Sequence, residues 1–230
     1  MTLAVMQPYL FPYLGYYQLA YCSDMFLFYD DVNYIKNGYI NRNYILTKNG
    51  IQRFSLPINS ASSFSKINSL IFNDNDKKIL IAIKQSYSKS PYFSDVYPMI
   101  EDVFKSDNRN VAHLASQSII KVFEYLNIEF KYDYTSNLNY NRSLSAKEKL
   151  YHFCKIYNSK IYVNTIGGEH LYDKNEFHEY GISLKFIMPP SIEYQQFNSD
   201  LFIPNLSMID LLMNLSCKEI IKLLGKYNVK

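Results

Sequence analysis

Short apolar runs alternate with amphipathic segments along the 230 residues of the chain. Near the N-terminus, the apolar run over 2–7 predicts a buried strand that ends at Pro8, because proline cannot donate a hydrogen bond to a neighbouring strand. A short helix is expected over 14–23, and the apolar run at the start of 25–31 predicts a second strand that is covered on both faces. The chain therefore opens with a strand, a loop, a helix and a strand.

The pattern changes over 32–58, where Tyr and Ile alternate with polar residues. This alternation predicts hairpin-like strands, and the turn signals between them are Asn37-Gly38 and Asn49-Gly50. A further strand is expected over 66–73. The sequence thus places an extended or hairpin insertion after the second strand.

Helical spacing returns in three segments, which are 76–89, 94–105 and 110–126. A strand is expected over 127–134. Ser145, with Glu148 three residues later, is typical of a capping box and predicts a helix that continues to about Tyr157. The remaining elements expected are strands over 160–164 and 182–187 and one or two helices beyond Pro204.

The order of these elements predicts a single α/β domain over residues 1–230. Alternating strands and helices are typical of a mostly parallel, Rossmann-like sheet flanked by helices. The C-terminus of this domain is expected to be helical, and no internal repeat or linker divides the chain.

Composition excludes several classes of protein. Lys plus Arg number 24 against 21 for Asp plus Glu, without a block of basic residues, so no nucleic-acid partner is expected. The three cysteines form no CxxC pair and no metal-ligand spacing, and no apolar run approaches the roughly 18 residues of a membrane span. We expect a cytoplasmic protein without metal, membrane insertion or a permanently bound cofactor.

Arginine is scarce in this Lys-, Asn-, Ile- and Tyr-rich sequence, so each arginine carries extra weight as a candidate functional residue. The four arginines are Arg42, Arg53, Arg109 and Arg142.

Three polar clusters fall where predicted strands end. They are Gln7, Pro8, Tyr9, Phe11, Pro12 and Gly15 after the first strand; Asp30 and Asp31 through Asn43 after the second; and Asn164, Gly167 and Gly168 after the strand over 160–164. Ligands of open α/β sheets bind at the carboxyl ends of strands, near the point where the strand order reverses. Each glycine or glutamine could equally serve its own loop, but together the clusters suggest a pocket wall.

The second cluster has more polar groups than a turn requires. Asn37-Gly38 is sufficient for a turn, which leaves Lys36, Asn41, Arg42 and Asn43 without a local purpose. A guanidinium grips carboxylates and phosphates in a planar fork, and lysine adds a point charge, so these residues suggest a site for an anionic ligand. The alternative is a structural ion pair between Asp31 and Arg42.

Candidate general bases are His170, close to the glycines, and Asp31, close to the basic cluster. His113, His152 and the helical Cys154 are read as core or surface residues. Asp210 lies on an otherwise apolar helix, so its carboxylate must find a partner or a ligand.

The segments "QPYLFPYLGYYQL" and "DMFLFYDDVNYIKNGYINRNYI" resemble the WbqC-like protein family. "SPYF", "IYVNTIGGEHLYD", "GISLKF" and "LSMIDLLMN" follow in the family's order, so the resemblance covers about residues 4 to 215. One departure is Tyr39, where the family pattern leads us to expect tryptophan. The family-like positions are Gln7, Pro8, Tyr9, Pro12, Gly15, Tyr16, Asp30, Asp31, Lys36, Asn41, Arg42 and Asn43, to which we add Gly167, Gly168 and Asp210.

The resemblance implies a bacterial protein of O-antigen or other surface-glycan synthesis. The favoured reaction is acyl or aminoacyl transfer to the amine of a nucleotide-linked amino sugar, with an unknown donor. Asp31, His170 and Lys36 are the candidate catalytic residues. Nucleic acid enters this scheme only if the donor is an aminoacyl-tRNA, and a homodimer remains open.

Two alternatives stay open. The loop, Gly15 and helix after the first strand are similar to the start of adenylate-transferring enzymes of the HIGH type, although Tyr16 stands where those enzymes have histidine, and no lysine-serine signature is clear near the C-terminus. The other alternative is a non-catalytic module that binds glycan precursors.

Overall fold

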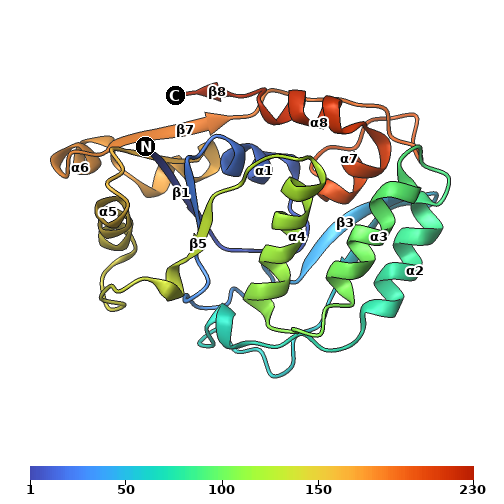
Figure 1. Ribbon diagram of the computed structural model, residues 1–230, viewed down its shortest axis with the longest axis horizontal. Coiled ribbons are helices and arrows are strands. Elements are labelled where there is room, and N and C mark those ends of the chain that lie inside the picture. The colour runs from blue at the N-terminus through green and yellow to red at the C-terminus, as the bar shows by residue number, and fades with distance from the viewer.

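The fold, described for residues 1–230 by a computed structural model, is built on a six-stranded sheet (Figure 1). Its strands lie in the order β5 (Tyr132–Tyr134), β2 (Met25–Phe28), β1 (Thr2–Met6), β6 (Ile161–Thr165), β7 (Ser183–Met188) and β8 (Asn228–Val229). All neighbours pair in parallel except β7 and β8. The prediction of a mostly parallel, Rossmann-like sheet is confirmed.

Helices cover both faces of this sheet. Their bounds are α1 Leu14–Tyr21, α2 Asp76–Tyr87, α3 Phe93–Phe104, α4 Val111–Tyr125, α5 Ala146–Ile156, α6 Lys174–Glu179, α7 Met208–Asn214 and α8 Cys217–Leu224. In β1, Leu3 and Val5 pack with α5 and α6, whereas Ala4 faces the larger core that contains α1, α4, α7 and α8. This separation follows from the period-two alternation of side chains in a strand.

The insertion after β2 contains the antiparallel hairpin of β3 (Arg42–Thr47) and β4 (Gly50–Ser55). Its turn is the predicted Asn49-Gly50, and Gly50 adopts a φ of 98°, which glycine tolerates best. The prediction of a second hairpin turn at Asn37-Gly38 was wrong, because this turn lies in a loop without flanking strands.

The strand expected over 66–73 was also wrong. A 3-10 helix at Ile67–Ser69 occupies its centre, because the amides of Ile67 and Asn68 bond to the carbonyls of Val32 and Asp30 and not to a neighbouring strand. Similarly, β5 begins only at Tyr132, since α4 is followed by Asn127 with a φ of 55°. A further 3-10 helix, Ile166–Leu171, replaces the loop expected at Gly167 and Gly168.

The strand order reverses between β1 and β6. From β1 the chain moves outward through β2 to β5, and it then returns to the other side of β1 to form β6 and β7. Ligands of open α/β sheets bind in the crevice at such a switch point, beyond the carboxyl ends of the strands. A ligand is therefore expected beside the segments that follow β1 and β6. None of the helices combines the length and the apolar character that crossing a membrane requires.

Candidate functional site

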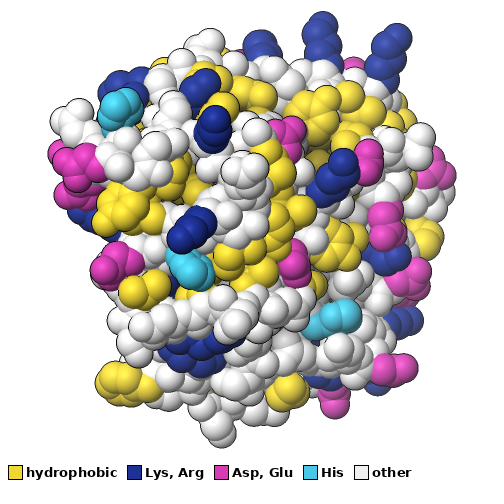
Figure 2. Space-filling model, turned by 60° about the vertical axis from the view of Figure 1, so that its left-hand side comes forward, with side chains coloured by type: hydrophobic (Ala, Val, Ile, Leu, Met, Phe, Trp, Pro, Cys, Tyr) yellow, Lys and Arg dark blue, Asp and Glu magenta, His cyan; other side chains and the backbone are white.

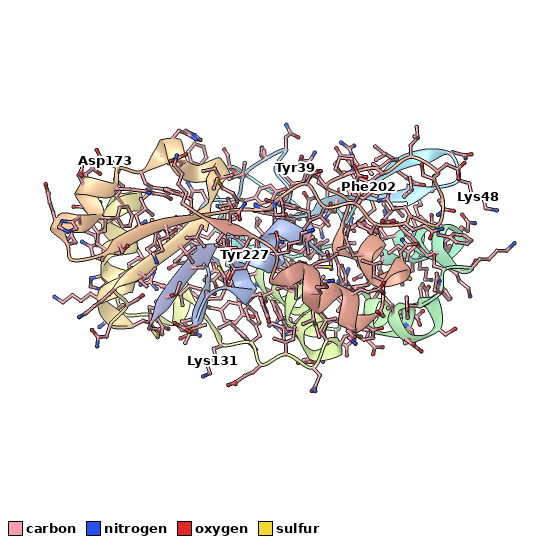
Figure 3. All side chains as sticks on the ribbon, turned by 90° about the horizontal axis from the view of Figure 1, so that it is seen from above. Tyr39, Lys48, Lys131, Asp173, Phe202 and Tyr227 are labelled. Atoms are coloured by element: carbon pink, nitrogen blue, oxygen red, sulfur yellow. The ribbon has the colours of Figure 1, made fainter.

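The three polar clusters lie at one edge of the sheet, where β1, β2 and β6 end. Figure 3 shows this edge, with Tyr39 from the insertion, Asp173 from the segment after β6, and Phe202 from the segment after β7. Lys131, which precedes β5, marks the opposite edge in the same view. The sequence placed these clusters after the carboxyl ends of strands, and the parallel strand order puts those ends at the same edge.

The β1–α1 loop, residues 7–13, is held in an unusual conformation. Phe11 adopts a φ of 42° and is fully buried. Its amide donates to Ser118 Oγ at 2.8 Å, and its carbonyl accepts from Asn43 Nδ2 at 2.6 Å and from Ser207 Oγ at 2.7 Å. A non-glycine residue in this region costs roughly 1–3 kcal/mol and persists where its surroundings determine it. Three distant parts of the chain therefore fix the shape of this loop.

Asn43 is a structural member of the predicted cluster. Its Nδ2 donates to both Leu10 O, at 3.1 Å, and Phe11 O, and the side chain is buried. We expect Asn43→Ala to lower the free energy of unfolding by about 1–3 kcal/mol, because buried carbonyls lose their donor. Urea denaturation measures this effect. Asn175→Ala, at an exposed position of α6, is the matched control, and equal stabilities of the two variants would contradict this role of Asn43.

Asp30 and Asp31 fasten the end of β2 to the segment that follows β5. Asp30 accepts from the amide and hydroxyl of Ser136, at 2.9 and 2.6 Å. Asp31 accepts from Thr135 Oγ1 at 2.7 Å, from Tyr140 Oη at 2.7 Å and from Arg142 Nε at 3.0 Å, and its side chain is only 7% exposed.

The suggested ion pair between Asp31 and Arg42 was wrong, since Arg142 is the partner of Asp31. Burial and the neighbouring Asp31 carboxylate hold the pKa of Tyr140 well above its ordinary value, so Tyr140 stays a donor. Both oxygens of Asp31 are thus occupied by donors of the protein.

Arg42 has no carboxylate partner. None of the ion pairs in the structure includes Arg42 or Lys36. Arg42 Nη2 donates only to Asn37 Oδ1, at 3.4 Å, and Arg42 Nε is buried without any partner. A buried donor without an acceptor costs free energy, which an anionic ligand can recover.

The surroundings of Arg42 are polar and aromatic. Asn41 bridges Tyr34 and the carbonyl of Leu56, through bonds of 3.0 Å each, so it supports this wall from within. Burial raises the pKa of Tyr34, and the nearby Arg42 opposes that rise. Lys36 is exposed on the same segment as Tyr39, which is 57% exposed. A ligand can therefore reach this surface from solvent.

The family-like residues of the β1–α1 loop and α1 are mainly packing residues. Tyr16 is buried, and its hydroxyl donates to Gln7 O at 3.1 Å. Tyr9 packs edge-on against Tyr16 and lies 6.2 Å from the ring of Tyr39. Pro12 is buried, and its carbonyl accepts from Met208 N.

Gly15 is also buried, and it leaves space that the ring of Tyr13 fills. A Cβ at this position would lie 2.5 Å from that ring. Tyr13 can therefore lie against the start of α1.

The segment after β6 carries the third cluster. Gly168 packs close to the side chain of Asn164, where an added Cβ would lie 3.2 Å from Nδ2, whereas Gly167 is exposed and unconfined. His170 is exposed on the same 3-10 helix, and no hydrogen bond or ion pair of the protein occupies its ring. Among the predicted catalytic residues, His170 thus differs from Asp31 in that its side chain has no partner in the protein.

Asp210 is fully buried and finds its partners within the protein. It accepts from Tyr87 at 2.7 Å, from Tyr194 at 2.6 Å and from Gln196 at 3.0 Å. The buried carboxylate of Asp210 needs hydrogen-bond donors because it lies on an apolar helix, and these three side chains supply them. Asp210 therefore does not line the site itself but holds Tyr194 in place.

The protonation of Asp210 gives a prediction for stability. Burial raises the pKa of its carboxyl, and the three hydrogen bonds oppose this rise without cancelling it. A carboxyl with a higher pKa in the folded state binds more protons there than in the unfolded state. Its contribution to stability is therefore full below the unfolded pKa of about 3.9 and declines as the pH rises toward the folded pKa. We expect the difference in unfolding free energy between wild type and Asp210→Asn to decline with rising pH.

Asp133 provides the control of opposite sign. Burial alone raises its pKa, but hydrogen bonds from Asn137, Tyr157 and the amide of Tyr134 lower it below its ordinary value. The stability that Asp133 contributes is present above the unfolded pKa and is lost as the pH falls through the folded one. Urea denaturation of Asp210→Asn and Asp133→Asn across the acid range should give opposite trends, and parallel trends would contradict the assignment.

A cavity of about 400 Å³ opens beside the N-terminus of α1. The segment 189–206, which follows β7, forms its other side, and Tyr13, Gly15 and Tyr194 are among the lining residues. A larger cavity of about 550 Å³ lies near the amino ends of β6 and β7. Because ligands of such sheets bind beyond the carboxyl ends, we place the site at the first cavity and the adjoining edge.

The sequence did not indicate several residues of this region. Tyr140, Thr135 and Tyr194 lie far from the predicted clusters along the chain, so no local pattern pointed to them. Gln18 follows Gly15 by only three residues, but it was not among the predicted site residues. Arg142 carried one signal, the scarcity of arginine.

No group of three or more His, Cys, Asp and Glu side chains is placed to hold a metal ion. Basic and acidic side chains are interspersed over the side that carries α5 and α6 (Figure 2).

Comparison with known proteins identifies related sequences. The model of the WbqC-like protein family matches residues 7–222. The uncharacterized protein Rv1507c of Mycobacterium tuberculosis is 25% identical over 220 residues, which cover 94% of each chain. No solved structure matches the chain significantly.

Proposed function

Because the chain belongs to the WbqC-like protein family, we propose that it is a transferase of surface-glycan biosynthesis. The proposed substrate is a nucleotide-linked amino sugar, and the reaction is acyl or aminoacyl transfer to its amine. The family match and the Rossmann-like sheet support this proposal.

The observation that carries the proposal is Arg42. This guanidinium stands at the carboxyl edge without a carboxylate partner, its Nε is buried and unpaired, and Lys36 lies on the same segment. Two cations that lack partners of their own can hold the phosphates of a nucleotide-linked sugar. Arg142, by contrast, is already neutralised by Asp31.

The reaction requires a proton acceptor. The sugar amine attacks the carbonyl carbon of the donor, a new N–C bond forms, and the bond to the donor's leaving group breaks. The attacking nitrogen loses a proton in this step, and a positioned side chain can accept it. We assign this role to His170, because Asp31 already accepts from three donors. Asp31 then acts by positioning Tyr140 and Arg142 beside the end of β2.

The adenylate-forming alternative has a weaker basis. In that class the residue after the loop glycine binds phosphates, but here Tyr16 is buried and its hydroxyl is engaged by Gln7 O. An enzyme of that kind would need another phosphate ligand. Release of pyrophosphate from ATP distinguishes this alternative, and ligand binding without turnover distinguishes a non-catalytic module.

The proposal is tested by incubating the protein with nucleotide-linked amino sugars and a panel of acyl and aminoacyl donors. Mass spectrometry should reveal a sugar that has gained the mass of the transferred group. If no sugar gains mass, and none raises the melting temperature of the protein, the proposal fails.

A further inference from the structure

We propose that the cavity beside α1 binds the nucleobase of the substrate. This inference rests on the proposed function, because it assigns the part of a nucleotide-linked sugar that Arg42 and Lys36 do not hold. The cavity lies between the start of α1 and the segment 189–206.

The lining of the cavity suits an uncharged, flat group. No Asp, Glu, Lys, Arg or His lines it, and half of its 14 lining residues are hydrophobic. Tyr13, Tyr194 and Phe202 supply aromatic rings, and Pro189, Pro190 and Pro204 supply rigid apolar surface. Its volume of about 400 Å³ falls within the range of small-molecule sites. A nucleobase is neutral and planar, and it stacks on rings of this kind.

Gln18 provides a buried, unpaired acceptor at the wall of the cavity. This residue lines the cavity and is fully buried. Its Nε2 donates to Leu223 O at 2.9 Å and to Lys226 O at 2.8 Å, which fixes the orientation of the amide. Its Oε1, however, has no partner in the protein. A buried acceptor without a donor costs free energy, and the N–H or NH₂ group of a nucleobase can supply the missing bond.

The start of α1 places the cavity next to a suitable position for phosphate. Tyr13 provides no side-chain cap, and no acidic residue occupies the first turn. Backbone amides at a helix N-terminus favour an anion. A phosphate that follows the nucleobase along the substrate can therefore lie at this turn.

The segment 189–206 is tied to the strand that begins with Arg42. Within it, Asn198 Nδ2 donates to Leu46 O at 3.1 Å, and Ser207 N, directly after the segment, donates to Tyr44 O at 2.9 Å. The β1–α1 loop bonds to both sides, through Asn43 and through Ser207. The cavity and Arg42 thus flank one rigid loop, and a single extended ligand can contact both.

The absence of tryptophan from the sequence allows a direct test. Phe202→Trp places a unique fluorophore in the lining of the cavity. Titration with uridine, cytidine, thymidine, adenosine and guanosine, and with their 5′-diphosphates, should quench it saturably for at least one base. The control is Phe197→Trp, at a 44% exposed position that does not line the cavity. The nucleoside absorbs light equally in both samples, so a difference in quenching between the two variants reports binding.

A second substitution locates the bound base. Ser191 is exposed at the cavity, so Ser191→Tyr in the Phe202→Trp background fills space without disturbing the core. We expect the affinity for the base to fall by about tenfold or more. Ser94→Tyr, at an exposed position of α3, should leave the affinity unchanged.

The results separate this inference from the proposed function. Saturable quenching of Phe202→Trp that Ser191→Tyr weakens supports the nucleobase site, even if no sugar is modified. Mass transfer to a nucleotide-linked sugar without any quenching overturns the nucleobase site and leaves the transferase proposal intact. Quenching that Ser191→Tyr does not weaken also overturns it, because the base then binds elsewhere.

Discussion

Replacing Arg42 by alanine is expected to weaken the binding of a nucleotide-linked sugar by about 10- to 100-fold, because a hydrogen bond to a charged group is worth roughly 1.5–3 kcal/mol. The guanidinium has no ion-pair partner in the protein, so its removal leaves no buried carboxylate behind and folding should be little affected. Isothermal titration calorimetry with the sugar that gains mass in the transfer assay measures the effect.

The matched control is Arg53→Ala. Arg53 is exposed on β4, in the same hairpin as Arg42, and takes part in no ion pair. Arg42→Lys keeps the charge but not the planar fork, so its affinity should lie between those of wild type and Arg42→Ala. If Arg53→Ala and Arg42→Ala weaken binding equally, the effect comes from the overall charge and the assigned anion site is wrong.

Replacing His170 by glutamine is expected to lower kcat by about 10²- to 10⁴-fold, the usual contribution of a general base, and to change KM little. Glutamine keeps a polar side chain of similar size but cannot accept the proton of the amine. His170 is exposed and forms no side-chain hydrogen bond or ion pair, so the variant should unfold at the wild-type temperature. Steady-state kinetics of the mass-transfer reaction measures the change.

His178→Gln is the control for this experiment. His178 lies on α6, in the same connection between β6 and β7, and is likewise exposed. Its replacement should leave kcat unchanged. Wild-type kcat in His170→Gln would exclude His170 as the base and would return the role to Asp31 despite its three donors.

The sequence predicted the elements whose stability is local. β1, β6, β7 and the capping box of α5 appeared within one or two residues of their expected bounds, because apolar periodicity and Ser145 with Glu148 act over short distances. β2 ends at Phe28, before the predicted bound of 31. The strand expected over 66–73 failed for the opposite reason. Ile67, Leu70 and Phe72 are buried in the core beside α4, and no neighbouring strand offers a regular ladder.

The polar clusters lie at the ends of the strands that the sequence indicated, but the pairing of their side chains was not predicted. The two acids after β2 were recognised, yet Asp31 pairs with Arg142, which is 111 positions away in the sequence. The scarcity of arginine singled out the four arginines, but it did not separate those that support the fold from one that is available to a ligand. Arg109 and Arg142 bind backbone carbonyls and so support the fold. Only the structure distinguishes them from Arg42, whose side chain bonds to no backbone carbonyl and forms no ion pair.

The conformation of Phe11 has a consequence for biosynthesis of the protein. The residues that hold its backbone are Asn43, Ser118 and Ser207, so the motif encoded first depends on a serine encoded near the end. A nascent chain on the ribosome can form β1 and α1 early, but it cannot complete the loop between them until Ser207 has emerged. Fragments that end before Ser207 should therefore contain the whole N-terminal motif and still be unable to recognise the ligand.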